Sequence, residues 1–117
     1  MRTIETTRNT KVEVMDEKGQ GNGNHHYRIA EVTISNVKSI LGEIRFQNGP
    51  INKVGVNGAT NEDLIAIVID RLQGFQSGEY ACRDNALALT KLEEALMWLR
   101  HRTEERETRG VEGTHTI

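Results

Sequence analysis

Hydrophobic and polar residues alternate in short segments over the first half of the chain. The alternating segments are Lys11 to Glu17, in which Val12 and Val14 share a face, Tyr27 to Ser35, and Glu43 to Gln47. A period of two predicts strands that each bury one face. Between the first two segments, the letters GQGNGNHH supply residues that tolerate positive φ angles, which indicates a flexible hairpin connection.

A turn at Asn48-Gly49-Pro50 separates the third segment from Ile51 to Val56, which we predict to be a further strand. Proline removes one donor from the ladder, so this strand must begin at Pro50 or lie at an edge of the sheet. The strands together are expected over about residues 10–57.

A first helix is predicted over about residues 60–73. Asn57-Gly58 is a turn signal, and the Thr60 hydroxyl precedes two acidic residues, as an N-cap would. The body, LIAIVIDRLQ, is apolar on nearly all sides and rich in β-branched residues, so a buried strand is the alternative. Its length, the cap and Gly74 as a C-terminal stop favour the helix.

A long helix is predicted over about residues 82–108, ended by Gly110 and followed by a tail over 110–117. Leu89, Leu92, Leu96 and Leu99 follow the spacing of a narrow packing seam, and Cys82 extends the register. The helix would be about 40 Å long, against about 35 Å for the diameter of a compact domain of this size. We therefore expect the seam to contact another subunit as well as its own sheet. The alternative is a helix lying wholly along its own sheet with a frayed end.

These elements predict one α+β domain over residues 1–117, in which a small antiparallel sheet packs with two C-terminal helices and the last helix serves oligomerisation. A net charge of −2 argues against a general duplex-binding protein. The longest apolar run, Leu64 to Ile69, is far too short for a membrane span. The first residues lack the apolar stretch of a signal peptide, and the single Cys82 cannot form an internal disulfide, so a reducing cytoplasm is expected.

Three arginines beyond the leucine seam are candidate anion ligands. Arg102, Arg106 and Arg109 recur at i, i+4 and i+7, which places them on one helix face. A guanidinium matches phosphate oxygens in a bidentate manner, so three cations in a row indicate an anion between them. The alternative is a solvated face on which Glu105 pairs with Arg102 and Arg109.

Two other segments carry candidate binding residues. The turn from Asn57 to Asn61 leads into a helix N-terminus, where backbone N–H groups favour a phosphate, although plain strand-to-helix turning explains it as well. Phe75 and Tyr80 flank Ser77-Gly78, where an exposed ring could stack on a base. Packing of Phe75 under the long helix is the alternative, and we assign Met97 and Trp98 to packing.

Catalytic and metal chemistry have no readable signal in the sequence. The four histidines, at 25, 26, 101 and 115, match no metal-ligand spacing. Cys82 lies in the leucine register, where a cysteine is usually a small buried hydrophobe rather than a nucleophile. A binding protein without metal, cofactor or catalytic residues is therefore expected.

The run from Phe46 to His115 carries four specific pieces: GPI-to-GVNG, RLxxFQSG, CRDNALALTKLEEAL and RTxxRExRGVEGTH. Together they resemble the first-described phage anti-Thoeris sponge family. The resemblance implies a small α+β protein that forms oligomers, built of dimers and reaching a hexamer. It implies capture, without covalent change, of cyclic ADP-ribose isomers made by bacterial TIR enzymes in the host bacterial cytoplasm. Some members hold cyclic oligonucleotides at separate sites of the hexamer.

The same resemblance implies particular ligand residues. Arg28 and Arg109 match the family's pocket arginines, and Phe75, Arg83 and Asn85 follow from its motifs, together with the RGVEGTH tail. Asp84 departs from the glutamate more common in the family. The full predicted ligand-binding set is Arg28, Arg109, Phe75, Arg83, Asn85, Asn57, Arg102 and Arg106. The competing functions are a hydrolase of the same signal and an oligomeric adaptor that binds no ligand.

Overall fold

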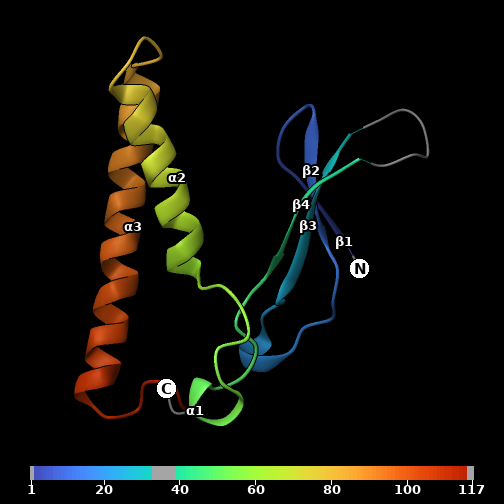
Figure 1. The fold of residues 1–117 in the computed structure, drawn as a ribbon, viewed down its shortest axis with the longest axis vertical. Helices are drawn as coiled ribbons and strands as arrows, with labels where there is room; N and C mark the ends of the chain where they lie inside the picture. Colours follow the sequence, from blue (N-terminus) through green and yellow to red (C-terminus); the bar gives the residue numbers. More distant parts are fainter. Residues whose placement is uncertain (1, 33–38, 116–117) are drawn as a thin grey trace. The chain divides into compact units, whose positions relative to one another are not determined.

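The computed structural model describes residues 2–32 and 39–115. The chain divides into two compact units, residues 1–59 and 60–117, and each is described by itself. The first unit holds the strands and the second a hairpin of helices (Figure 1). The predicted α+β class is therefore confirmed, whereas the assignment of both units to one domain stays a prediction.

The first unit is built on a four-stranded antiparallel sheet with strand order β1-β2-β3-β4. Its strands are β1 (Arg2–Glu5), β2 (Thr10–Val14), β3 (His26–Glu31) and β4 (Ile40–Arg45). Strand β1 was not among the predicted strands, because its only large apolar residue is Ile4 and it shows little alternation. The predicted strand from Tyr27 ends at Glu31, and residues 33–35 of that prediction lie outside the described residues.

The register gives the sheet one apolar and one polar face, because directly paired residues share a face. Ile4, Val12 and Ile29 are paired across three strands, and Tyr27 is paired with both Val14 and Ile44. These residues form the apolar face, on which Val14 is buried. Val12 and Val14 therefore share a face as the alternation predicts. The residues between them in each strand form the polar face.

The connection between β2 and β3 contains a short 3₁₀ turn, η1 (Gln20–Asn22). Gly21 and Asn22 both have positive φ angles there, at 70° and 65°. A left-handed backbone is the conformation that glycine and asparagine accept most readily. The cluster thus connects β2 with β3 and adopts positive φ angles, as predicted.

The predicted strand from Ile51 to Val56 is wrong. Residues Ile51–Val54 form a single helical turn, α1, with Pro50 as its N-cap and Gly55 at a φ of 75° as its C-cap. The side chain of Gln47 donates to the carbonyls of Gly49 and Gly55, at 3.1 and 2.9 Å. This amide closes the segment into a loop, so the backbone groups of α1 do not enter the sheet.

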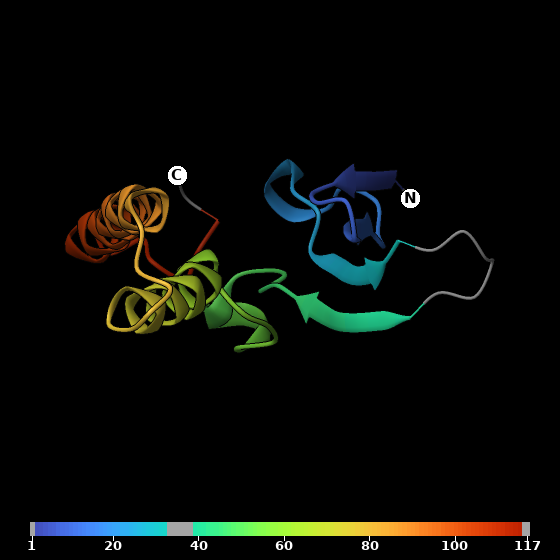
Figure 2. The ribbon, with the colours of Figure 1, turned by 90° about the horizontal axis from the view of Figure 1, so that it is seen from above.

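The second unit is a hairpin of α2 (Asn61–Gln76) and α3 (Arg83–Thr108), which lie side by side in both views (Figures 1 and 2). Thr60 caps α2 as predicted: Thr60 Oγ1 accepts from Asp63 N at 3.1 Å, and Thr60 N donates to Asp63 Oδ2 at 2.9 Å. This reciprocal pair is a capping box. Gly74 does not end the helix, which continues to Gln76 with Ser77 as its C-cap.

The hairpin buries Ile69 of α2 and Leu96 of α3, each 8% exposed, and the other seam leucines are half-buried. The seam thus packs on α2, a partner that the predicted packing on the sheet and on another subunit did not include. Met97 and Trp98 were assigned to packing, and that is wrong within the chain, since they are 53% and 60% exposed. Cys82 is also exposed rather than buried: it is the N-cap of α3, where its Sγ accepts from Asn85 N at 3.4 Å.

Candidate functional site

Arg28 lies at the centre of a charged row that crosses the polar face of the sheet. Its register partners are Glu13 on β2 and Glu43 on β4. Arg28 Nη2 lies 3.5 Å from Glu13 Oε1, which is a long ion pair, and the Arg28 side chain is 31% exposed. Arg28 Nε is buried and has no hydrogen-bond partner among the described residues. The protein therefore satisfies this guanidinium only in part.

Two further side chains, those of His26 and Arg45, contact the carboxylate of Glu43. Nε2 of His26 lies 2.5 Å from Glu43 Oε1, and Nη2 of Arg45 lies 3.2 Å from the same oxygen. The hydrogen bond with His26 lowers the pKa of Glu43 below its ordinary value of 4.5, and the nearby charges of Arg45 and Arg28 act in the same direction. Glu43 is therefore a carboxylate near neutral pH and offsets part of the positive charge around Arg28.

The connection between α2 and α3 gathers three of the predicted residues into one place, which we call the hairpin-tip cluster: Arg71, Phe75, Tyr80, Arg83 and Asn85. The rings of Phe75 and Tyr80 meet edge to face with centroids 5.9 Å apart. The guanidinium carbon of Arg71 lies 4.9 Å from the centre of the Phe75 ring. Sequence reasoning missed Arg71, although its place four residues before Phe75 was a usable signal.

Asn85 and Arg83 complete this cluster from the first turn of α3. Asn85 Nδ2 donates to the carbonyl of Tyr80 at 3.4 Å, which ties the helix to the connection. Arg83 is the first residue of α3 and is exposed. Half-buried Phe75 is thus covered by Arg71 and Tyr80 on its own hairpin, and the cluster presents a guanidinium beside an aromatic pair.

At the other end of α3 the chain reverses through a Schellman motif. Arg109 is the C-cap, and Gly110 follows with a φ of 73°. Gly110 N donates to Glu107 O and Val111 N donates to Arg106 O, both at 3.0 Å. These are the two bonds that define the motif. The reversal brings residues 110–114, which we call the tail turn, back over the last turn of α3.

The three arginines predicted to share one anion have different surroundings. Arg102 is exposed, and the Arg109 side chain is 45% exposed, with its Nη1 3.2 Å from Glu105 Oε1. Arg106 is 5% exposed. Its Nε donates to Glu112 Oε2 at 3.0 Å, and its Nη2 donates to the carbonyls of Val111 and Thr114 at 3.0 and 3.3 Å. Arg106 thus contacts the tail turn, and the sequence did not indicate Glu112 as its partner.

Asn57 lies outside all of these clusters, in the loop around α1. Its Nδ2 donates to Asn48 O at 2.7 Å, and its Oδ1 accepts from Asn48 N at 2.8 Å. A Cβ at the adjacent Gly58 would come within 2.4 Å of the Phe46 carbonyl. The Asn57-Gly58 turn is therefore required for local packing, as its alternative interpretation holds, and a ligand role for Asn57 stays a prediction.

The hairpin-tip cluster and the tail turn lie at opposite ends of α3. Arg102 follows Arg83 by 19 positions, which corresponds to about 29 Å along an α-helix. Within one chain these two groups cannot contact the same small nucleotide. The structure thus links Phe75 and Asn85 through Tyr80, with Arg83 in the same turn of α3 as Asn85. It places Arg102, Arg106 and Arg109 at the far end of the helix.

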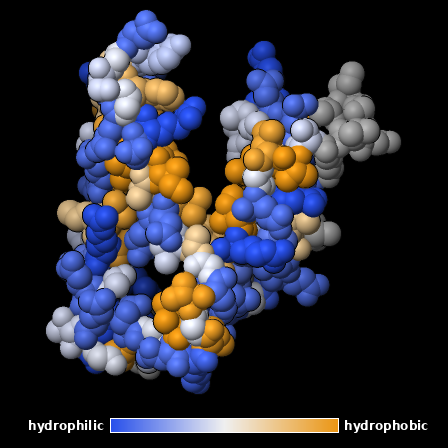
Figure 3. Space-filling model, viewed as in Figure 1, coloured by the Kyte–Doolittle hydropathy of each residue, from blue (hydrophilic) through white to orange (hydrophobic). Residues whose placement is uncertain are grey.

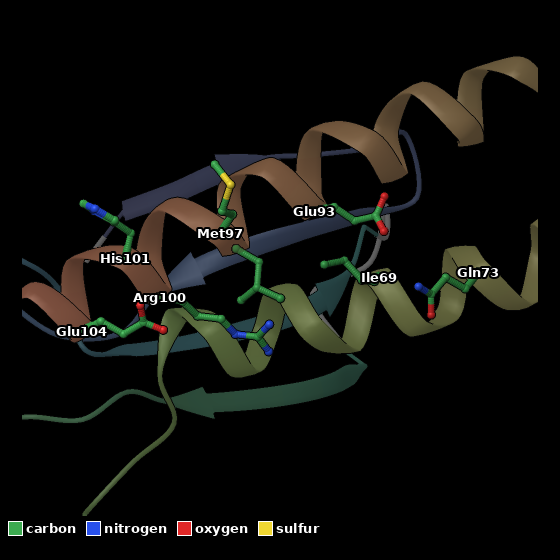
Figure 4. A pocket seen from close by; sticks show the side chains of 8 residues that line it. Ile69, Gln73, Glu93, Met97, Arg100, His101 and Glu104 are labelled. Atoms are coloured by element: carbon green, nitrogen blue, oxygen red, sulfur yellow. The ribbon is translucent and has the colours of Figure 1, made fainter.

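An open groove of about 530 Å³ runs along the middle of the hairpin (Figure 4). Ile69 and Gln73 line it from α2, and Glu93, Leu96, Met97, Arg100, His101 and Glu104 line it from α3. The figure shows Arg100 extending from α3 toward α2. None of the predicted ligand residues lines this groove.

Two absences hold for the described ranges 2–32 and 39–115. In these ranges, no cluster of three or more His, Cys, Asp or Glu side chains is placed to hold a metal ion. No helix in the same ranges combines the length and the apolar character that crossing a membrane requires.

The chain is thus a small α+β protein with a sheet that carries a charged row and a helical hairpin with polar clusters at both ends. A family model described as Acb2/Tad1, hairpin domain, matches residues 38–104, which is more than half of the chain. The protein belongs to this family, and the membership predicted from the sequence is confirmed. Arg28, Arg106 and Arg109 lie outside the matched residues, whereas the hairpin-tip cluster lies inside them.

A relative from Bacillus phage SBSphiJ7, named Thoeris anti-defense 1, is 60% identical over 85 residues. The match covers 73% of this chain and 60% of the relative's length. The relative is therefore substantially longer than the part it shares with this chain.

Proposed function

We propose that the protein binds a cyclic ADP-ribose isomer made by bacterial TIR enzymes and holds it without cleaving it. Through this capture it blocks Thoeris defence in the host bacterial cytoplasm. The observation that carries the proposal is 60% identity to a phage protein whose name states an action against Thoeris. The protein is a binder rather than an enzyme in this proposal.

The polar clusters suit the chemistry of such a ligand. A pyrophosphate is matched by the planar donors of arginine, which are offered by Arg28 on the sheet and by Arg102 and Arg109 near the tail turn. A nucleobase stacks on aromatic or guanidinium surfaces, which the hairpin-tip cluster offers. These features support a ligand of the ADP-ribose class.

Both ends of α3 can serve one ligand only if two copies of the chain meet. An antiparallel pair of hairpins would bring the hairpin-tip cluster of one copy toward the tail turn of the other. Apolar side chains are exposed on the hairpin (Figure 3), which supports such an assembly. Among the exposed apolar residues of the two helices, Ile67 is 63% exposed and Trp98 60%. We propose a homo-oligomer of dimers that reaches a hexamer. Light scattering tests this, and a stable monomer of 13.2 kDa would contradict it.

The function is tested by purifying the protein from cells that express an active TIR synthase, heating it, and identifying the released small molecules by mass spectrometry. The expected result is an intact cyclic ADP-ribose isomer. In a titration, free ligand should fall linearly until the sites are filled. A new product that accumulates with substoichiometric protein would instead show the hydrolase, and absence of any bound nucleotide would favour the adaptor.

The same titration distinguishes one site from two. Some relatives of this type are expected to hold cyclic oligonucleotides at separate sites, so a cyclic oligonucleotide is added to protein already saturated with the ADP-ribose isomer. Binding without displacement supports separate sites. Displacement of the first ligand would assign both to one site.

A further inference from the structure

Arg106 is the one charged residue that the described part of the chain buries, at 5% exposure. Burial of a guanidinium is costly unless its donors are paired. Arg106 meets this condition through Glu112 and two backbone carbonyls, with donor–acceptor distances between 3.0 and 3.3 Å. All of these partners belong to the tail turn. We call the set of contacts from Arg106 to Glu112, Val111 and Thr114 the tail latch.

The tail latch adds to a backbone turn that is weak by itself. Beyond the two Schellman bonds, Thr114 N donates to Val111 O at 3.1 Å, and the Thr114 hydroxyl donates to the same carbonyl. Gly113 has a φ of 81°, so the chain reverses a second time within the tail turn. A turn with two left-handed glycines loses much conformational entropy on ordering. The buried guanidinium supplies the charge-assisted bonds that offset this loss.

The position of the latch connects it to the ligand residues. Arg106 lies about one turn before Arg109, which is the C-cap of α3 and directly precedes the tail turn. Arg109 is 45% exposed, whereas Arg106 directs its donors into the protein. Movement of the tail turn would change the backbone conformation at Arg109 and so the direction of its side chain. Arg106 therefore acts on this end of the molecule through the tail rather than by its own charge.

We propose that Arg106 is a positioning residue, which through Glu112 and the carbonyls of Val111 and Thr114 holds the tail turn so that Arg109 and the tail meet an anionic ligand in one geometry. The proposal rests on the proposed function, because it specifies how the same site is organised. It assigns a role to Glu112, a carboxylate that would by itself repel an anion.

Glu112 supplies the decisive experiment. Calorimetric titration with a glycocyclic ADP-ribose, a cyclic ADP-ribose isomer of the proposed class, is carried out on the full chain and on Arg106→Met, Glu112→Gln and the double variant. Positioning predicts that each single variant weakens binding about tenfold, as expected for loss of a bond to a charged group. The double variant should be no weaker than the singles, because both remove one latch. The control Arg100→Met, an exposed arginine on the same helix, should change binding by less than about twofold.

Other outcomes overturn the proposal. If Arg106→Met weakens binding while Glu112→Gln leaves it equal or tighter, Arg106 contacts the ligand directly. If both variants lower the unfolding temperature but bind as the unchanged protein does, the latch serves stability alone. Arg106→Lys, which keeps the charge but loses the planar fork, should bind more weakly than the unchanged protein and more tightly than Arg106→Met.

Hydrogen exchange separates this inference from the function on which it rests. In ligand-free protein, the amides of Val111 and Thr114 should lose protection in Arg106→Met and Glu112→Gln, while the amides of central α3 keep theirs. If the unchanged protein fails to bind the glycocyclic ADP-ribose, the proposed function fails, but the exchange result still decides whether the latch exists. Unchanged protection of both amides in both variants would refute the latch.

Discussion

Arg28 on the sheet and Arg106 on the hairpin are both arginines predicted to bind the ligand, and the two regions treat them differently. Arg28 lies on an open polar face, 31% exposed, with one ion pair at 3.5 Å and a buried Nε that has no partner among the described residues. Arg106 is 5% exposed and donates to one carboxylate and two carbonyls at 3.0 to 3.3 Å.

The difference shows which arginine N–H donors remain available to a ligand in each region. A guanidinium has five N–H donors, and those that the protein uses are not offered to an anion. On the sheet, the Nε donor of Arg28 has no partner among the described residues. On the hairpin, Arg106 donates to Glu112, Val111 and Thr114 of the tail turn, whereas the Arg109 side chain is 45% exposed. Arginines at helical spacing therefore differ in the donors that they offer to an anion, because Arg106 is buried while Arg102 and Arg109 are exposed.

The largest effect is expected in the hairpin core. Leu96→Ala should destabilise the protein by about 2 to 5 kcal/mol, since Leu96 is 8% exposed and its loss leaves a cavity against α2. Val14→Ala in the sheet should cost less, because fewer atoms are removed. Thermal unfolding followed by circular dichroism measures both. Two separate transitions, with each variant moving only one, would show that the sheet and hairpin unfold independently.

Binding should depend on the exposed arginines of both regions. Arg28→Ala and Arg109→Ala should each weaken binding of a glycocyclic ADP-ribose by about 1.5 to 3 kcal/mol, the scale of a hydrogen bond to a charged group. Folding should change little, because both side chains are partly exposed, Arg28 at 31% and Arg109 at 45%. Calorimetry measures the affinity, with Arg8→Ala as a control in an exposed loop. Normal binding by a folded variant removes that arginine from the site.

The backbone conformation of the tail turn can be tested by the same change, glycine to alanine, at Gly110 in the turn and at Gly74 inside α2. Gly110→Ala should destabilise by about 1 to 2 kcal/mol, because its φ of 73° is left-handed and strains any side chain. Gly74→Ala should instead stabilise by about 0.5 to 1 kcal/mol, because alanine favours a helix interior and a Cβ there meets nothing within 4 Å. Urea unfolding measures both changes. Equal signs would contradict the assigned backbone conformations.

The smallest effect concerns the charged row of the sheet. The pKa of Glu43 is lowered, chiefly by its hydrogen bond with His26, so its contribution to stability is present above its ordinary value of 4.5 and is lost as pH falls through the lower value in the folded protein. Glu43→Gln should flatten this part of the pH profile of stability. Asp16, whose pKa the backbone N–H of His25 lowers, remains as the acid-sensitive group of the variant. If the pH profile of stability is the same in Glu43→Gln, groups other than Glu43 cause the loss of stability in acid.

Elements stabilised by contacts within a few residues were predictable. Thr60 and Asp63 form the capping box that their spacing indicates, and the long helix begins within a residue of its predicted start and ends at Thr108. The seam leucines pack because a helical period records which face is apolar. The motifs from Phe46 onward were specific enough to predict the family, because they combine turn, cap and surface residues in fixed order.

The errors lie where a local pattern fits two structures. Ile51 to Val56 alternates over too few residues to separate a strand from a helical turn, and the side chains of Gln47 and Asn57 decide for the turn by bonding across the loop. Gly74 is a common stop signal, but the next turn of α2 is held by the contact of Phe75 with Arg71 and Tyr80. Cys82 shares the leucine register, yet as the N-cap it lies before the packed part of α3.

The sequence by itself determined the α+β class, the cap of α2, the extent of α3 and the family, because each rests on periodicity, on neighbours within one or two turns, or on motifs that can be read along the chain. Only the tertiary structure decided which charges are available. Arg102, Arg106 and Arg109 are alike in spacing, and the return of the tail over α3 buries one of them and leaves the others exposed. Burial of a charge depends on which segment folds back onto it, and helical spacing carries no record of that contact.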